Sequence, residues 1–286
     1  SQELLDAFDL INLIFITIAL VVTWPLAIFV YSKLLLCKPY STNYTFTLIV
    51  LNGVSELFGC TTFLVNFQIA TFPFARPLIV LLSNKDIGYP MKALDYLANG
   101  IGLHTAFFVA LNRCKSIISL RRKGTDSTFF FASTTISLLF ASLKIIDLYA
   151  FSNHYYNETD FGSGPIFIPM IEVFDKTLRT ITDIETAVVS CCTFILNVVL
   201  AVFLARRRIP DDRCTSENID CRFKGERGLI ITSVVSYTFY TFYFVNSFIA
   251  RYYDITFCGY AQFLFLGLAS LTPFWCLIIF ASSIRR

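Results

Sequence analysis

Long apolar stretches recur along the whole chain, and they restrict its possible folds more than any other feature. A helix rises about 1.5 Å per residue, so roughly 20 apolar residues cross a hydrocarbon core about 30 Å thick. By that measure the sequence holds seven candidate spans, at residues 8–31, 44–70, 93–112, 128–151, 178–205, 228–250 and 257–282. We therefore expect an all-α integral membrane protein, with residues 1–286 forming one seven-transmembrane helix bundle.

The composition excludes a water-soluble fold. Of the residues, 56% are hydrophobic and only 15% are charged, whereas a soluble domain carries roughly 25% charged residues. The mean hydropathy is +0.65. A globule of this size would have to bury more apolar surface than its interior can hold.

The basic residues predict the orientation of the bundle. With the N-terminus outside the cytosol, 16 of the 23 Lys and Arg residues fall in cytosolic segments and six fall outside, while Lys144 lies within a span. That bias agrees with the positive-inside rule. The first apolar stretch is too long for a cleavable signal peptide and lacks a basic residue before it, so we expect it to act as a membrane anchor. The sixteen are Lys33, Lys38, Arg113, Lys115, Arg121, Arg122, Lys123, Arg206, Arg207, Arg208, Arg213, Arg222, Lys224, Arg227, Arg285 and Arg286.

Two Asn-x-Thr sequons give a check that does not depend on charge. This topology places Asn157 in an outside loop, where it is a candidate glycosylation site, and Asn43 on the cytosolic side, where it cannot be modified.

Cysteine and histidine usage argues against an enzyme. The nine cysteines are an odd number, and only Cys258 lies near the outside surface, so no closed disulfide framework is expected. With two histidines in the chain, neither a multi-histidine metal centre nor a histidine-based catalytic site is expected. No phosphate loop, nucleophile elbow or zinc-protease motif occurs. We expect no cofactor, no metal and no nucleic-acid partner.

Polar residues inside the spans mark the candidate sites, because charges at the bilayer centre cost roughly 2.5–3.5 kcal/mol each. Glu56 either binds an ion or a ligand amine, or is a hydrogen-bonded carboxyl in helix packing. His104 interrupts the third span. Lys144 and Asp147 are three residues apart, so they share a helix face and can neutralise each other. The outer halves of the last four spans, together with Tyr253 between the last two, offer a candidate site for a small organic ligand. Its residues are Lys144, Asp147, Asp183, Glu185, Asn246, Tyr253 and Gln262.

The predicted cytosolic face carries a second candidate site. The third span closes with Asn112, Arg113 and Lys115, and the fifth is followed by residues 206–208, which are all arginine. An arginine here is either an interfacial anchor or part of a switch that docks a signalling partner. The candidate docking residues are Asn112, Arg113, Lys115, Arg206, Arg207 and Arg208.

Short motifs in these spans resemble those of nematode serpentine chemoreceptors. They are Leu-Asn-Gly at 51–53, Leu-Asn-Arg at 111–113, Ser-Ile at 116–117, Thr-Pro-Phe-Trp at 272–275 and Ser-Ile-Arg at 283–285. The class gamma superfamily, with its V, U and X classes, is the most similar. The resemblance covers essentially the whole chain. It implies a G-protein-coupled receptor for environmental small molecules, in the plasma membrane and sensory-neuron cilia, with a heterotrimeric G protein and membrane lipids as partners.

The chain also departs from rhodopsin-like receptors. Arg113 would take the place of the arginine in their Asp-Arg-Tyr motif, but Asn112 replaces the acid and Cys114 the tyrosine. No Asn-Pro-x-x-Tyr follows in the last span, where Pro273 stands alone. An ordinary member of that class is therefore excluded.

The alternative function is a transporter or ligand-gated channel that uses Glu56, Lys144, Asp147 and Asp183 as an ion path. The odd span count argues against the duplicated halves common in transporters. The sequence leaves open the ligand, the G-protein class and whether the bundle forms homo- or hetero-oligomers.

Overall fold

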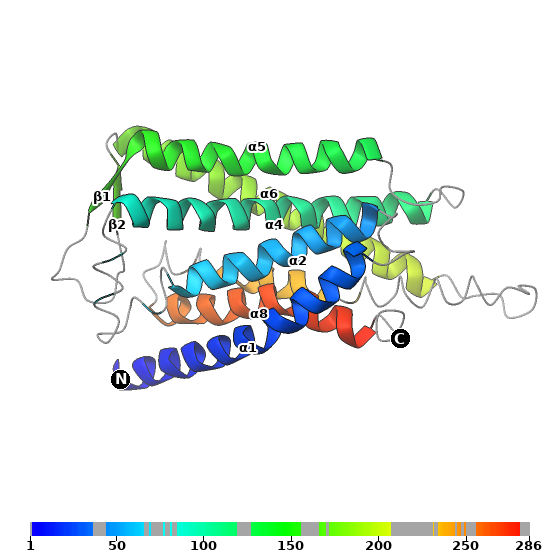
Figure 1. The fold of residues 1–286 in the computed structure, drawn as a ribbon, viewed down its shortest axis with the longest axis horizontal. Helices are drawn as coiled ribbons and strands as arrows, with labels where there is room; N and C mark the ends of the chain where they lie inside the picture. The colour runs from blue at the N-terminus through cyan, green and yellow to red at the C-terminus, as the bar shows by residue number, and fades with distance from the viewer. Residues whose placement is uncertain are drawn as a thin grey trace, which may run out of the picture.

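The structure is a computed structural model, and it describes residues 2–36, 44–65, 69, 77, 81, 85–118, 127–155, 166–169, 172–206, 231, 234–243, 245–246, 249 and 256–280. These residues are almost entirely helical (Figure 1). Residues 234–243 form a helical segment before the last helix. The named helices are α1 (Gln2–Leu36), α2 (Tyr44–Phe63), α4 (Lys85–Ile118), α5 (Ser127–Phe151), α6 (Glu172–Arg206) and α8 (Thr256–Phe280).

Among the described residues, five helical stretches are long and apolar enough to cross a membrane, as expected of a helical membrane protein. They are Leu10–Leu36, Tyr44–Phe63, Asp86–Lys115, Ser127–Ile146 and Ile184–Phe203. In α8 the apolar stretch is shorter, at Leu264–Trp275. The count of seven spans and the orientation of the N-terminus remain predictions.

Two short strands interrupt the helices at one end of the bundle. β1 (Ser152–Tyr155) and β2 (Ile166–Pro169) pair antiparallel, from Ser152 opposite Pro169 to Tyr155 opposite Ile166. They lie in the connection between α5 and α6, at the end where α1 begins (Figure 1). We call this the ribbon end, and the end where α4 finishes the far end.

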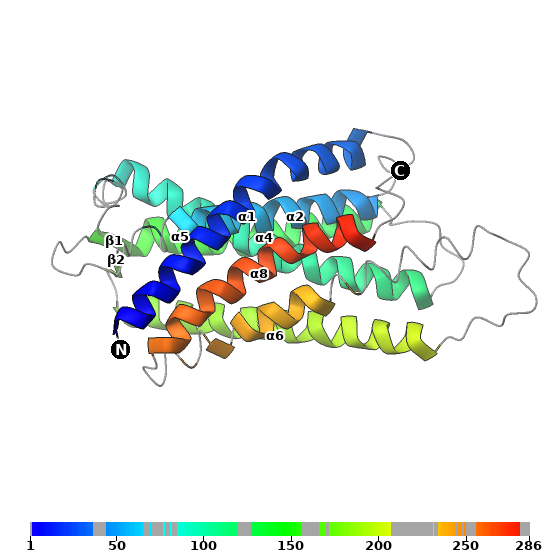
Figure 2. The same ribbon diagram turned by 90° about the horizontal axis from the view of Figure 1, so that it is seen from below.

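α4 is the central helix among those described. It packs against α2, α5 and α6, whereas α1 packs against α2 and α8 (Figure 2). Because α4 is covered on several sides, polar side chains such as Asp95, His104 and Asn112 face other helices. This explains why its sequence is the least apolar of the five candidate spans.

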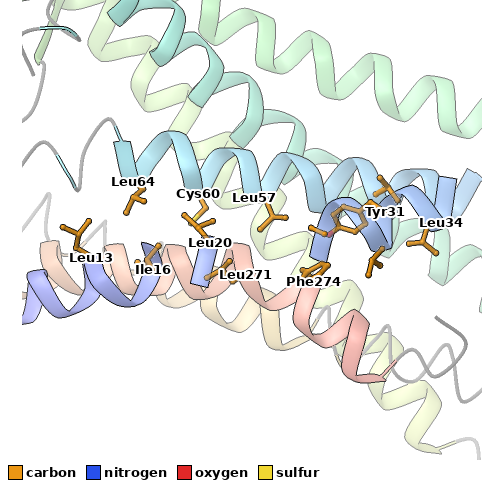
Figure 3. Packing of buried hydrophobic residues seen from close by; sticks show 13 residues of the cluster. Leu13, Ile16, Leu20, Tyr31, Leu34, Leu57, Cys60, Leu64, Leu271 and Phe274 are labelled. Carbon is orange, nitrogen blue, oxygen red and sulfur yellow. The ribbon is translucent and has the colours of Figure 1, made fainter. Parts of the chain in front are cut away.

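A continuous apolar core joins α1, α2 and α8. Leu13, Ile16 and Leu20 of α1 lie between the other two helices, which contribute residues such as Leu57 and Phe274 (Figure 3). Tyr31 meets the Phe274 ring edge to face, with the centroids 5.8 Å apart. This packing holds the first and last helices of the chain together.

The outward faces of α1, α5 and α6 are apolar instead of charged. Large hydrophobic side chains are exposed along each of them, in a pattern unusual for a soluble monomer. They include Ile11, Ile14, Ile18 and Val21 of α1, Phe131, Leu139, Leu143 and Ile146 of α5, and Ile181, Ile184, Val188, Ile195 and Val199 of α6. Such faces suit contact with lipid tails, where the backbone of each helix is already hydrogen-bonded internally.

Candidate functional site

The first polar cluster ties the beginning of α4 to α2. The Lys92 ammonium lies 2.9 Å from the Asp95 carboxylate. The other Asp95 oxygen accepts from the Asn99 amide over 2.8 Å and from the Thr62 hydroxyl of α2 over 3.3 Å. Lys92 also lies 4.9 Å from the centroid of the Tyr96 ring. Asp95 is fully engaged by these donors, so this cluster serves helix packing.

The second cluster joins three helices near the middle of α4. His104 of α4 places Nε2 2.8 Å from Oε1 of Glu185 on α6. Lys144 of α5 places Nζ 3.9 Å from the other oxygen of the same carboxylate. His104 is buried, whereas the side chains of Lys144 and Glu185 are 16% and 17% exposed. The cluster therefore places one acid between two bases inside the bundle.

The imidazole of His104 is held rigidly by two further contacts. Its Nδ1 lies 2.8 Å from the backbone carbonyl of Gly100, one turn earlier in α4. Its ring stacks on Phe140 of α5, with centroids 4.8 Å apart and planes inclined by 11°. These contacts fix the orientation of the ring, with Nε2 on the side of α6.

The third polar centre surrounds Glu56 of α2, which is buried. Its carboxylate accepts a hydrogen bond from the Tyr240 hydroxyl of the segment 234–243. Ser270 of α8 forms a second side-chain hydrogen bond with it. Gly102 of α4 leaves room beside Oε1, since a Cβ at that position would lie 3.2 Å from that oxygen. Glu56 thus connects α2 to two later parts of the chain across the face of α4.

The far end of α4 carries the arginine singled out by the sequence. Arg113 is buried, and it acts electrostatically on the Tyr237 hydroxyl of the segment 234–243. Thr193 of α6 also lies beside that hydroxyl. Arg113 therefore lies where α4, α6 and the segment 234–243 approach one another.

The neighbours of Arg113 differ from each other in their environment. Asn112 is buried and donates to the Thr45 hydroxyl of α2 over 3.1 Å. Lys115 is exposed and lies 5.5 Å from the centroid of the Phe129 ring of α5. In this conformation Asn112 contacts another helix, and Lys115 is open to the surroundings.

The structure brings together only part of the predicted ligand site. Lys144 and Glu185 meet, and His104 joins them. Asn246 instead donates to the carbonyl of Phe242 in its own helix over 2.8 Å. The structure describes the backbone but not the side chain of four predicted site residues, which are Asp147 on α5, Asp183 and Arg206 on α6, and Gln262 on α8. It does not describe Tyr253, Asn157, Arg207 or Arg208 at all.

Sequence reasoning missed the hydroxyl partners of these polar groups. These partners come from other helices than the groups they contact. They are Tyr240 and Ser270 at Glu56, Thr62 at Asp95, and Thr45 at Asn112. For Tyr240, the Ser, Thr and Tyr content of the sixth predicted span was the available signal, since such side chains favour helix–helix contacts.

The fold and these clusters define a helical membrane protein with polar ties between its helices. Within the described ranges, no three or more His, Cys, Asp and Glu side chains come together in a way that could hold a metal ion. No protein-family model and no curated protein matches the chain.

Proposed function

We propose that the chain is a G-protein-coupled chemosensory receptor with seven spans, its N-terminus outside the cytosol, that detects a small environmental molecule. The single observation that carries the proposal is the position of α4. This central helix contacts α5 and α6 through the His104 cluster, and it carries Arg113 against the segment 234–243 at the far end. A change at the first contact can therefore be transmitted along one rigid helix to the second.

The His104 cluster is the part of the bundle best suited to a polar ligand. An acid and two bases lie together here, and Lys144 and Glu185 are partly exposed. A small molecule with a charged or hydrogen-bonding group can exchange for one of these internal contacts. A few placed polar groups in apolar surroundings are what a site for a small organic molecule needs.

Signalling would follow as a population shift. A ligand that binds one arrangement of α4, α5 and α6 more tightly favours that arrangement, and only this difference in affinity drives the change. Arg113 and Tyr237 then separate or approach as the helices shift at the far end. In the predicted orientation that end faces the cytosol, next to the basic segment that follows α6.

The test is nucleotide exchange on purified heterotrimeric G proteins added to vesicles that contain the full chain. The vesicles are exposed to pools of small acids, amines, alcohols and esters. We expect at least one pool to accelerate exchange severalfold over vesicles without the chain, and Arg113→Gln to abolish that acceleration. Lys33→Gln is the matched control, because Lys33 is a basic residue in the last turn of α1, and it should leave the acceleration intact.

The alternative is tested on the same vesicles. Ligand-dependent ion or proton flux, with no exchange on any G protein, would overturn the receptor proposal in favour of a transporter or channel. Arg113→Gln should change such a flux no more than the control variant Lys33→Gln does.

A further inference from the structure

Both ring nitrogens of His104 face oxygen acceptors. Nδ1 lies 2.8 Å from the Gly100 carbonyl oxygen, and Nε2 lies 2.8 Å from a carboxylate oxygen of Glu185. The first contact is a hydrogen bond, whereas the second is a close charge contact in which neither Nε2 nor Oε1 has hydrogen-bond geometry. The carbonyl carries no proton to give, so Nδ1 must be the donor in the first contact.

The second contact then needs a proton of its own. A neutral imidazole donates from only one nitrogen, so with Nδ1 as donor its Nε2 is a bare acceptor. An ionised carboxylate is also only an acceptor. Two acceptors at 2.8 Å repel each other, so one further proton on the pair stabilises this contact between α4 and α6.

We propose that His104 and Glu185 form a proton-binding site, and that its occupancy holds α4 against α6. With the proton on the ring, the pair is an ion pair between helices at a distance of 2.8 Å. Without it, a lone pair and a carboxylate face each other in apolar surroundings, where the repulsion is stronger than in water. The proton is thus a ligand that binds the packed arrangement of α4 and α6 more tightly than the separated one.

The groups around the pair favour this arrangement. Lys144 of α5 lies on the far side of the Glu185 carboxylate, so positive, negative and positive groups alternate when the ring holds the proton. From α2, Glu56 lies against Gly102, two residues before His104 in the chain. The side chains of Asp147 on α5 and Asp183 on α6 are outside the described residues.

The inference does not depend on receptor function, because its readout is the stability of the helix bundle. The experiment measures the melting temperature of the purified full chain in lipid nanodiscs from about pH 5 to about pH 9, the range that brackets histidine titration. We expect the melting temperature to fall as the pH rises. The fall should be roughly 2–4 °C or more, since that is the shift from one lost interaction in a protein of this size.

Glu185→Gln is the decisive variant. A glutamine amide donates to the bare Nε2 of a neutral imidazole, so the contact survives without the extra proton. The melting temperature of Glu185→Gln should therefore lose the pH-dependent fall. His154→Gln is the matched control, because His154 is the other histidine of the chain, and it should keep the fall. A fall that persists in Glu185→Gln, or disappears in His154→Gln, would overturn the proposal.

Nuclear magnetic resonance of the His154→Gln protein gives a second, independent measurement. His104 is then the only imidazole in the chain, so its two ring nitrogens are observed without overlap. At low pH in this range both nitrogens should carry or share a proton, and at high pH one of them should become bare as the melting temperature drops. A ring whose Nε2 is bare throughout, with no pH-dependent change, sinks the proposal even if the substituted chains fold poorly.

Discussion

Trp275 of α8 donates a hydrogen bond from its indole Nε1 to the Thr23 hydroxyl of α1 over 3.0 Å, joining residues 252 positions apart in the sequence. The neighbouring residue of α1, Trp24, donates in the same way to Thr61 of α2 over 3.0 Å. Two adjacent positions of α1 therefore fix it to both of its partner helices. In an apolar bundle, where hydrophobic burial does not distinguish protein from lipid, such directional bonds select one packing of the helices.

We predict that Thr23→Val destabilises the bundle. Thr23 is fully buried, so valine removes the acceptor and leaves the Trp275 indole N–H unsatisfied, at a cost of roughly 1–3 kcal/mol. The melting temperature in detergent should fall by roughly 2–4 °C for each kcal/mol lost. Thr272→Val is the control, because the Thr272 hydroxyl donates to the Leu268 carbonyl of its own helix. Equal losses in the two variants would count against an interhelical role for Thr23.

Asp95→Asn should be the most destabilising conservative change in the polar clusters. Asparagine keeps an oxygen for the Asn99 and Thr62 donors but removes the charge that faces the buried Lys92 ammonium. Removing one partner of a buried ion pair costs about 3–5 kcal/mol, which the denaturation midpoint in detergent will report.

A compensating change separates the effect of charge from that of shape. When Lys92→Met is added to Asp95→Asn, no buried charge remains in the pair, and most of the lost stability should return. A double variant no more stable than Asp95→Asn would mean that the ion pair itself does not carry the effect.

The sequence predicts the helices well because the bilayer sets their length. The predicted spans 128–151 and 257–282 nearly coincide with α5 and α8. The predicted span 93–112 is shorter than α4, which begins at Lys85, because Lys92 interrupts the apolar pattern just before it. Lys92 is buried and paired with Asp95, which in turn accepts a hydrogen bond from Thr62 of α2. Hydropathy cannot register a polar group that is satisfied by another helix.

The candidate site is less predictable, because partners on different helices depend on how each helix is rotated. Spacing along the chain paired Lys144 with Asp147, three residues later. In the structure Lys144 approaches Glu185, and Glu185 approaches His104. All three are unusual residues for a membrane span, and the sequence identified them as such. The periodicity within one helix does not predict that α4, α5 and α6 bring them together.

Two glycines lie close to different kinds of neighbour, a backbone atom at Gly100 and the end of a side chain at Gly267, so alanine should have different effects at the two positions. A Cβ on Gly100 would lie 2.9 Å from Cβ and 3.1 Å from Cα of Ala141 in α5. Since a backbone atom cannot move aside alone, Gly100→Ala should force α4 and α5 apart, at a cost of about 1–3 kcal/mol.

Gly267→Ala is the matched comparison. Its Cβ would meet the Cδ1 end of the Ile16 side chain at 2.7 Å, and that end can rotate away. The gain in helix propensity, roughly 0.8–1 kcal/mol, then offsets the local adjustment. The melting temperature of Gly267→Ala should be close to that of the unmodified protein, and the melting temperature of Gly100→Ala should be clearly lower. The reverse order would contradict the close approach of α4 and α5.

The orientation of the bundle has its own test in the two sequons. If the N-terminus and the ribbon end face away from the cytosol, Asn157 is open to glycosylation during synthesis with microsomes and Asn43 is not. We therefore expect one glycan on the full chain, lost in Asn157→Gln and kept in Asn43→Gln, as a mobility shift on gels will report. A glycan on Asn43 instead would put the far end outside. Arg113 and the basic segment after α6 would then face away from G proteins, and the transporter or channel would become the leading function.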